Sequence, residues 1–321
     1  MKRGNKKAQF NFAWLFAVLV GGAILFLAIF GAMKTGDTSR FQSDSQIAKS
    51  ISVLTDPLQA GFSEGSYGSI HFKEETRINN YCYSTEFGKN DISVSTRSDI
   101  GQEWNEAGAA TSIYNKYIFS PEKSSGKDYY VLSKPFELPY KISDLIFLIS
   151  ENYCFMDAPE EIYNELLAFN IPLIEVINET QECTLSNTIR VCFSSERDDC
   201  DISVINTCSL NECDSVYDTG IVEKSGDDDL NYVGNLVFAA IFSDETNYDC
   251  NVQRLLYRAE KIADQLTEKI DIMTSRGCSS SLKPGLIDWS NELSNTQTED
   301  IDSLYSHAVT LEDKNDREDL W

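Results

Sequence analysis

The sequence predicts an α+β fold in which an apolar amino-terminal helix precedes a strand-rich domain that carries a long amphipathic helix. Three observations predict this class: an uncharged apolar run over residues 12–33, several short β-branched and aromatic runs between residues 69 and 222, and a helical repeat from Val252 to Met273. About 290 residues follow the apolar run, which is enough for one large domain or two smaller ones.

The apolar run from Phe12 to Met33 has the length of a membrane span, because a helix rises about 1.5 Å per residue and a bilayer core is roughly 30 Å thick. More basic residues precede the run than follow it, so the positive-inside rule places the amino terminus in the cytoplasm. We therefore expect a single-pass protein of the cell membrane with the lipid bilayer as its partner. It would have a cytoplasmic leader at 1–11, a transmembrane helix at 12–33 and an extracytoplasmic remainder. The preceding basic residues are Lys2, Arg3, Lys6 and Lys7.

The start of the chain also bears on processing. The run is longer than the apolar core of an export signal and lacks a good Ala-x-Ala site at its exit, which indicates a retained anchor. The segment Lys6-Lys7-Ala8-Gln9 resembles the class III signal of archaeal type IV pilin-like proteins, in which a prepilin peptidase cuts after the small residue. This resemblance implies cleavage between Ala8 and Gln9. The chain departs from the family at Ala13, where many pilins have Glu, and an uncleaved signal anchor is the alternative.

A second resemblance covers more of the chain. The start Ala8-Gln-Phe-Asn-Phe-Ala-Trp14 and the segment from Ile149 to Glu161 are similar to those of membrane-anchored proteins from small-genome archaea. The resemblance implies an envelope location and no particular activity.

Small residues recur every fourth position within the apolar run. Such residues let helix backbones approach closely in lipid, which predicts a homo-oligomer or an envelope partner held through the span. The positions are Ala13, Ala17, Gly21, Ala28 and Ala32.

Residues 34–60 are expected to form a juxtamembrane stalk helix. Ile47, Ala48, Ile51 and Leu54 fall on one helical face, and Asp56-Pro57 would end the helix.

The extracytoplasmic domain is expected to cover residues 61–290, with a possible subdivision near residue 170. A helix is expected at 142–151 and a stronger one at 158–168, with Asp157 as its N-cap. A second strand-rich part is expected from residue 171 to the apolar run 236–242. A helix of about six turns would follow and stop at Gly277. From residue 291 to 321 we expect an acidic disordered tail, since its few leucines cannot offset the ordering entropy.

All nine cysteines follow the apolar run, on the side where disulfides persist. An odd count leaves one thiol without an intrachain partner. The cluster from Cys183 to Cys213 lacks the paired spacing of a zinc site, which favours disulfides across short hairpins. Cys250 and Cys278 bracket the long helix, about 35–40 Å apart, so we expect them to bond Cys82 and Cys154 in either order. The nine are Cys82, Cys154, Cys183, Cys192, Cys200, Cys208, Cys213, Cys250 and Cys278.

Charge and composition restrict the function. The net charge is −24, and removing the +4 of the leader leaves −28 outside, which disfavours nucleic-acid binding. The chain has two histidines, His71 and His307, which disfavours catalysis that depends on histidine. No catalytic, cofactor-binding or metal-binding residue is expected. Asn178 begins a glycosylation sequon.

These observations favour a non-catalytic envelope protein, with a pilin-like or surface-assembly role. The alternative is a membrane-tethered ectoenzyme, for example a carboxylate-dependent hydrolase. It would be distinguished by a concave cluster of acidic side chains with raised pKa values.

Overall fold

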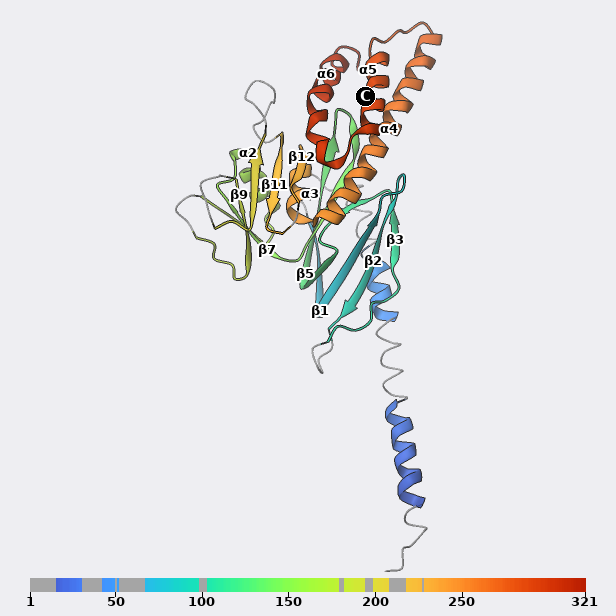
Figure 1. The fold of residues 1–321 in the computed structure, drawn as a ribbon, viewed down its shortest axis with the longest axis vertical. Coiled ribbons are helices and arrows are strands. Elements are labelled where there is room, and N and C mark those ends of the chain that lie inside the picture. The colour runs from blue at the N-terminus through green and yellow to red at the C-terminus, as the bar shows by residue number, and fades with distance from the viewer. Residues whose placement is uncertain are drawn as a thin grey trace, which may run out of the picture.

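The structure is a computed structural model that describes residues 16–30, 42–49, 51, 67–97, 103–178, 182–193, 199–207, 218–226 and 228–321. It has a mixed α+β head built on two β-sheets, with a helical layer at one end and a separate amino-terminal helix at the other (Figure 1). The expected α+β class is confirmed.

The first sheet has the strand order β3-β2-β1-β5-β6-β4. Neighbouring strands pair antiparallel except for β4 and β6, which are parallel. The Asn80 N–H donates to the Glu122 carbonyl at 2.9 Å, which continues the β1–β5 pairing by one residue beyond Asn79 and Lys123. The strands are β1 (Tyr67–Tyr83), β2 (Lys89–Thr96), β3 (Thr111–Tyr114), β4 (Tyr117–Phe119), β5 (Lys123–Glu137) and β6 (Lys141–Ile149).

The two faces of this sheet contribute to two hydrophobic clusters. On β6, Leu145 and Phe147 belong to the main core, whereas Ile146 and Leu148 belong to a second cluster. The second cluster is closed by the short helix at residues 42–49, from which Ala48 is buried, and by the buried Ile51. This helix covers part of the range in which the stalk was expected, and Leu54, Asp56 and Pro57 lie outside the described residues.

The second sheet has the order β12-β11-β10-β9-β7-β8, and helix α2 (Glu160–Phe169) connects the parallel strands β7 and β8. This sheet begins at Asn152, so the expected subdivision near residue 170 cuts through it. Its strands are β7 (Asn152–Met156), β8 (Ile174–Ile177), β9 (Thr188–Cys192), β10 (Ile202–Asn206), β11 (Thr219–Lys224) and β12 (Leu230–Val233).

Three local predictions are wrong. The expected helix at 142–151 is strand β6, whose residues are buried on both faces and therefore show no alternation. The apolar run 236–242 is helix α3 (Leu236–Phe242), all seven residues of which are buried. Helix α2 has Pro159 as its N-cap without a side-chain cap, where Asp157 was expected.

Helix α4 (Glu245–Ser275) confirms the long amphipathic helix. The Asp244 side chain caps its first turn by accepting from the Asn247 N–H at 2.9 Å. At the other end Gly277 has φ +93°, and the Cys278 N–H donates to the Met273 carbonyl at 3.0 Å. The stop expected at Gly277 is therefore present.

The expected disordered tail at 291–321 is instead helical. Helix α5 (Lys283–Asn295), the 3₁₀ helix η1 (Thr298–Leu304) and helix α6 (Tyr305–Asn315) pack beside α4 at the top of Figure 1. Leu304, Leu311 and Leu320 are buried in the main core. The prediction is wrong because α4 and the sheets supply the apolar surface that the tail lacks by itself.

Three disulfides hold the head. Cys82 bonds Cys250, which confirms half of the expected pairing. The other half is wrong, because Cys154 bonds Cys183 and Cys278 is a free, exposed thiol. Cys192 bonds Cys200 between the parallel strands β9 and β10, so no hairpin is involved. Cys208 and Cys213 lie outside the described residues.

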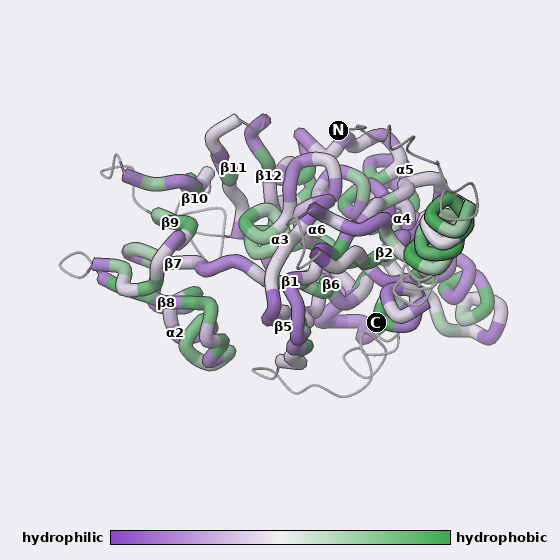
Figure 2. Tube along the Cα trace, turned by 90° about the horizontal axis from the view of Figure 1, so that it is seen from below, coloured by the Kyte–Doolittle hydropathy of each residue, from purple (hydrophilic) through white to green (hydrophobic). Residues whose placement is uncertain are grey.

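The amino-terminal helix at residues 16–30 has every residue exposed and is hydrophobic in Figure 2. It covers part of the expected span at 12–33. Ala17, Gly21 and Ala28 lie on it, with nothing within 4 Å of the position that a Gly21 side chain would take. Among the described residues, no helix combines the length and hydropathy of a membrane crossing. Ala8, Gln9, Ala13 and Ala32 lie outside the described residues.

Candidate functional site: a cationic cavity beside helix α4

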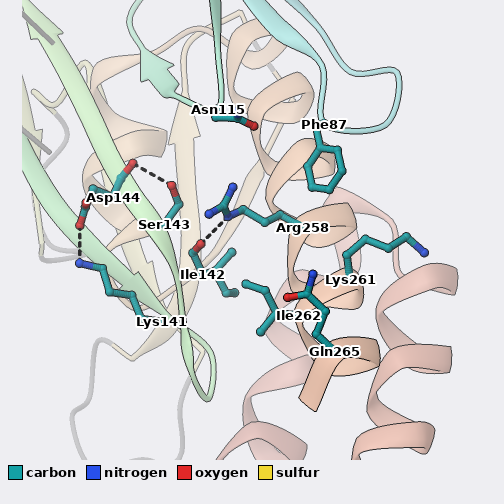
Figure 3. A pocket seen from close by; sticks show the side chains of 10 residues that line it. All are labelled: Phe87, Asn115, Lys141, Ile142, Ser143, Asp144, Arg258, Lys261, Ile262 and Gln265. Atoms are coloured by element: carbon teal, nitrogen blue, oxygen red, sulfur yellow. Dashed lines mark hydrogen bonds and ion pairs between the residues drawn. The ribbon is translucent and has the colours of Figure 1, made fainter. Parts of the chain in front are cut away.

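The candidate site is a cavity of about 650 Å³ between α4 and the first sheet, which we call the cationic cavity. Its walls come from α4, from the beginning of β6, from the β1–β2 turn and from the β3–β4 turn. Figure 3 shows Arg258 in the middle, Lys141 and Asp144 on one side, and Phe87 and Lys261 on the other. The lining residues are Phe87, Asn115, Lys141, Ile142, Ser143, Asp144, Arg258, Lys261, Ile262 and Gln265.

Two turns with left-handed backbone form the upper rim. Gly88 ends the β1–β2 turn at φ +53°, where a Cβ atom would lie 1.9 Å from the Tyr83 carbonyl oxygen. Only glycine fits this position without a backbone shift. Asn115 forms the β3–β4 turn at φ 55°, a conformation that asparagine tolerates better than most residues. These turns bring Phe87 and Asn115 to the cavity.

Arg254 fixes both turns from below. Its Nε donates to the Phe87 carbonyl and its Nη2 to the Lys116 carbonyl, both at 2.9 Å. Its Nη1 donates to the side-chain oxygens of Asn90 and Asn251 at 2.6 and 2.7 Å. The side chain is fully buried, and this burial lowers the pKa of Arg254 to about 10. The guanidinium is therefore held by neutral oxygens and acts as a fixed positive charge under the rim.

Asparagines extend this network along the contact between α4 and the first sheet. The Asn247 amide donates to the carbonyls of Asn80 and Ser120 at 2.9 and 3.0 Å, and the Asn251 amide donates to the Ile118 carbonyl at 3.1 Å. The Cys82–Cys250 disulfide joins the same two elements. We call this set the arginine network; it comprises Asn80, Asn90, Asn247, Asn251 and Arg254 with their carbonyl partners.

Arg258 lies one turn further along α4 and is only half-buried. Its Nε donates to the Ile142 carbonyl at 2.7 Å, as the dashed line in Figure 3 marks. Among the described residues it has no carboxylate within ion-pair distance. The adjacent Tyr117 is fully buried, and burial raises the pKa of its phenol despite the opposing charges of Arg258 and Arg254. Arg258 thus leaves a cationic edge available inside the cavity.

The other charges of the cavity are partly neutralised. Lys141 pairs with Asp144 at 2.9 Å, and Lys261 pairs with Glu260 at 2.5 Å. The hydrogen bond that Lys261 donates to Glu260 raises the pKa of Lys261, so this ammonium stays protonated. Lys261 also lies 3.5 Å from Asp264. Arg258 is therefore the cation of the cavity lining that has no carboxylate partner among the described residues.

Exposed aromatic residues gather at one edge of the first sheet. After residue 51, eight large hydrophobic side chains of the described chain are exposed, and the four aromatic ones all lie on β1, on β3 or in the turn between β1 and β2. Tyr83 faces Lys89 across the sheet, and Lys89 faces Tyr114, so the three share one face. The Cys82 side chain bonds Cys250 on α4, so this tyrosine face is turned away from α4. Of the four aromatic residues, Tyr81, Tyr83, Phe87 and Tyr114, only Phe87 lines the cavity.

A second concave site is acidic. Asp228, Glu245, Asp249 and Glu299 line a pocket of about 50 Å³, which has room for a few water molecules. Burial, followed by the negative charges of Glu299, Glu245 and Asp228, raises the pKa of Asp249 to about 6. Within the described chain, no three His, Cys, Asp or Glu side chains are arranged to hold a metal ion. This acidic pocket is the feature that was expected to distinguish a hydrolase.

A third cavity, of about 570 Å³, lies between the helix at 42–49 and β1. Its walls mix His71 and Lys73 with Asp44 and Glu74, so no charge sign dominates.

The residues expected to carry function are dispersed. Asn178 is exposed at the end of β8, and the rest of its sequon lies outside the described residues. His71 pairs with Asp128 at 2.6 Å on the surface, and His307 pairs with Glu292 at 2.5 Å beside Trp289. Neither histidine lines the cationic cavity or the acidic pocket.

The sequence reasoning identified none of the residues in the cationic cavity. One signal was available: Arg254 interrupts the apolar face of α4 between Val252 and Leu255. A charge at a core position of a long helix indicates a buried polar network and therefore a site for inspection.

Comparisons of the chain with protein-family profiles, with curated proteins and with solved structures find no match.

Proposed function

We propose that the chain is a membrane-anchored protein of the cell envelope whose head faces outward and has a non-catalytic role in binding or surface assembly. The observation that carries the proposal is the helix at 16–30. Its large apolar side chains are exposed, for example Phe16 at 67% and Phe26 at 69%. A contiguous apolar surface of this kind needs lipid or another chain around it.

Two further features support this proposal. The three disulfides suit the oxidising side of a membrane. In the cationic cavity Ser143 is the only hydroxyl among the lining residues, and its Oγ donates to the Asp144 carbonyl at 3.5 Å rather than to a base. This arrangement supports binding better than nucleophilic catalysis.

Membrane attachment is tested by alkaline carbonate extraction of membranes from cells that produce the full chain. The protein should stay in the pellet, and protease added to intact cells should remove the head. Leu19→Lys with Leu25→Lys should release it, since each charge at a span centre costs about 2.5–3.5 kcal/mol. Ile272→Lys, an equally exposed apolar site on α4, is the control and should stay bound. Release of the unaltered chain by carbonate would contradict the proposal.

The pilin-like form of the proposal is tested by intact mass spectrometry of the membrane-extracted protein. A mature chain that begins at Gln9 supports prepilin-type processing and assembly through the helix. A chain that retains Met1 to Ala8 overturns the pilin-like form and leaves an ordinary signal anchor.

The ectoenzyme alternative rests on the raised pKa of Asp249 in the acidic pocket. A pocket of about 50 Å³ has no space for a sugar ring, which argues against glycoside hydrolysis at this place. Hydrolysis of a glycoside by the full chain that Asp249→Asn abolishes would reverse this preference.

A further inference from the structure

We propose that the cationic cavity binds a carboxylate-bearing saccharide, such as a chain of uronic acid residues. This ligand class goes beyond the proposed anchoring role and does not depend on it. The cavity offers such a ligand a cation, hydrogen-bonding groups and an aromatic ring.

The charge of the cavity selects an anion. Arg258 points a guanidinium into the centre of the cavity and has no carboxylate partner among the described residues, whereas Lys141 and Lys261 already have acidic partners (Figure 3). A guanidinium binds a planar carboxylate through two parallel N–H···O bonds. Because the rest of the molecule is strongly acidic, few other places on its surface would hold an anion.

The hydrogen-bonding groups suit a hydroxyl-rich ligand. Asn115 and Gln265 provide amide groups, and Ser143 provides a hydroxyl. Each amide both donates and accepts, as a sugar hydroxyl requires. A volume of about 650 Å³ lies within the range of cavities that enclose small organic ligands.

Phe87 provides the apolar contact. It packs edge-on against Tyr257 with ring centroids 5.0 Å apart, which leaves the Phe87 ring supported yet 39% exposed. Rigid exposed aromatic rings are typical of recognition surfaces. Phe87 therefore offers the apolar face of one sugar ring a contact at the rim of the cavity.

Arg254 makes this arrangement rigid. It holds the carbonyl of Phe87 and the carbonyl next to Asn115, so the aromatic and amide contacts are fixed before a ligand arrives. Preorganisation of this kind lowers the entropy lost on binding.

The test is isothermal titration of the full chain in detergent with α-1,4-linked trigalacturonate. Its fully methyl-esterified form serves as the neutral control, because it keeps the sugar rings and hydroxyls and replaces each carboxylate by an uncharged ester. We expect binding of the acid, at least tenfold weaker binding of the ester, and weakening of the acid complex as salt is raised. Arg258→Gln should weaken the acid at least tenfold. Asn115→Gly, which keeps the left-handed backbone but removes the amide, should weaken both forms.

Arg276→Gln is the matched control, because Arg276 is exposed at the end of α4 and lies outside the cavity. It should leave affinity unchanged. Equal affinity for the acid and its ester, or an Arg258→Gln variant with the affinity of the unaltered chain, would overturn the proposal. Tighter binding of hexa-aspartate than of trigalacturonate would also overturn it, in favour of an acidic peptide. Circular dichroism of Arg258→Gln checks that its fold is retained.

Discussion

Arg254 of the arginine network and Arg258 of the cationic cavity lie one helical turn apart on α4, yet their guanidinium groups have different surroundings. Arg254 is fully buried and its guanidinium donates to four oxygens, whereas Arg258 is half-buried and donates to one carbonyl in a space of about 650 Å³. A guanidinium whose donors are all used contributes to the fold, while one with unused donors facing a cavity is available to a ligand. The predictions below test this difference.

The largest loss of stability is expected from removal of the Cys82–Cys250 disulfide, which joins the same two elements as the arginine network. Cys82 and Cys250 are 168 residues apart, and loop entropy assigns a bond over this separation about 5 kcal/mol of unfolding free energy. Cys82→Ala with Cys250→Ala should lose about this much. The control pair Cys192→Ala with Cys200→Ala, 8 residues apart, should lose about 2.5 kcal/mol. Chemical denaturation of the full chain in detergent measures both, and equal losses would contradict the loop argument.

Arg254→Met should lower the free energy of unfolding by about 3 kcal/mol, because it leaves buried oxygens without donors. The same change at Arg258 should cost about 1 kcal/mol or less and should act mainly on ligand affinity. Denaturation and titration with trigalacturonate, run on both variants, separate the two roles. If both variants lose the same stability, the two arginines are not distinct in the way described.

Gly88→Ala tests whether the turn backbone positions Phe87. The substitution should cost about 2 kcal/mol, part of it from the left-handed backbone and part from the clash with the Tyr83 carbonyl. It should also weaken saccharide binding by displacing Phe87. Gly234→Ala has the same φ of +53° with nothing within 4 Å, so it should cost about 1 kcal/mol and leave binding unchanged. Identical results for the two glycines would count against the role of the turn.

The smallest change in stability is expected from the acidic pocket. The pKa of Asp249 is raised in the folded state to about 6, so the folded protein binds a proton more tightly than the unfolded chain does. Stability should therefore fall as pH rises from about 4 to 6 on account of this residue. Asp249→Asn should remove this dependence and raise stability at pH 7 by on the order of 1 kcal/mol, after allowance for solvent screening. A parallel pH dependence in the two proteins would exclude Asp249 as its source.

Local sequence patterns predicted the elements that expose one face and failed for those buried on all sides. Helix α4 was recognised because its apolar residues recur with helical spacing along one face. Strand β6 and helix α3 were misassigned because Ile146 and Phe147 are both buried on the strand, and every residue of α3 is buried on the helix. Uniform burial removes the periodicity on which the assignment depends.

Long-range contacts explain the other failures. Leu311 was expected to bury too little apolar surface to order the tail, yet it is buried in the main core with α4 and α5. Cys154 lies on β7 and Cys183 lies between β8 and β9, the two strands that pair with β7, in a sheet whose order the sequence does not state. The cationic cavity combines Phe87, Asn115 and Arg258 from three distant segments, so only the folded chain places them together.

The Cys82–Cys250 bond also determines how the head would respond to mechanical force. If tension entered through the amino-terminal helix and left through the helices after α4, the bond would carry it directly from β1 to α4. The 168-residue loop between the two cysteines would then carry no tension. About 570 Å of extended chain would therefore not be pulled out. Both turns of the cationic cavity and the whole second sheet lie inside that loop. A pulled molecule would therefore keep these parts folded until the disulfide is reduced.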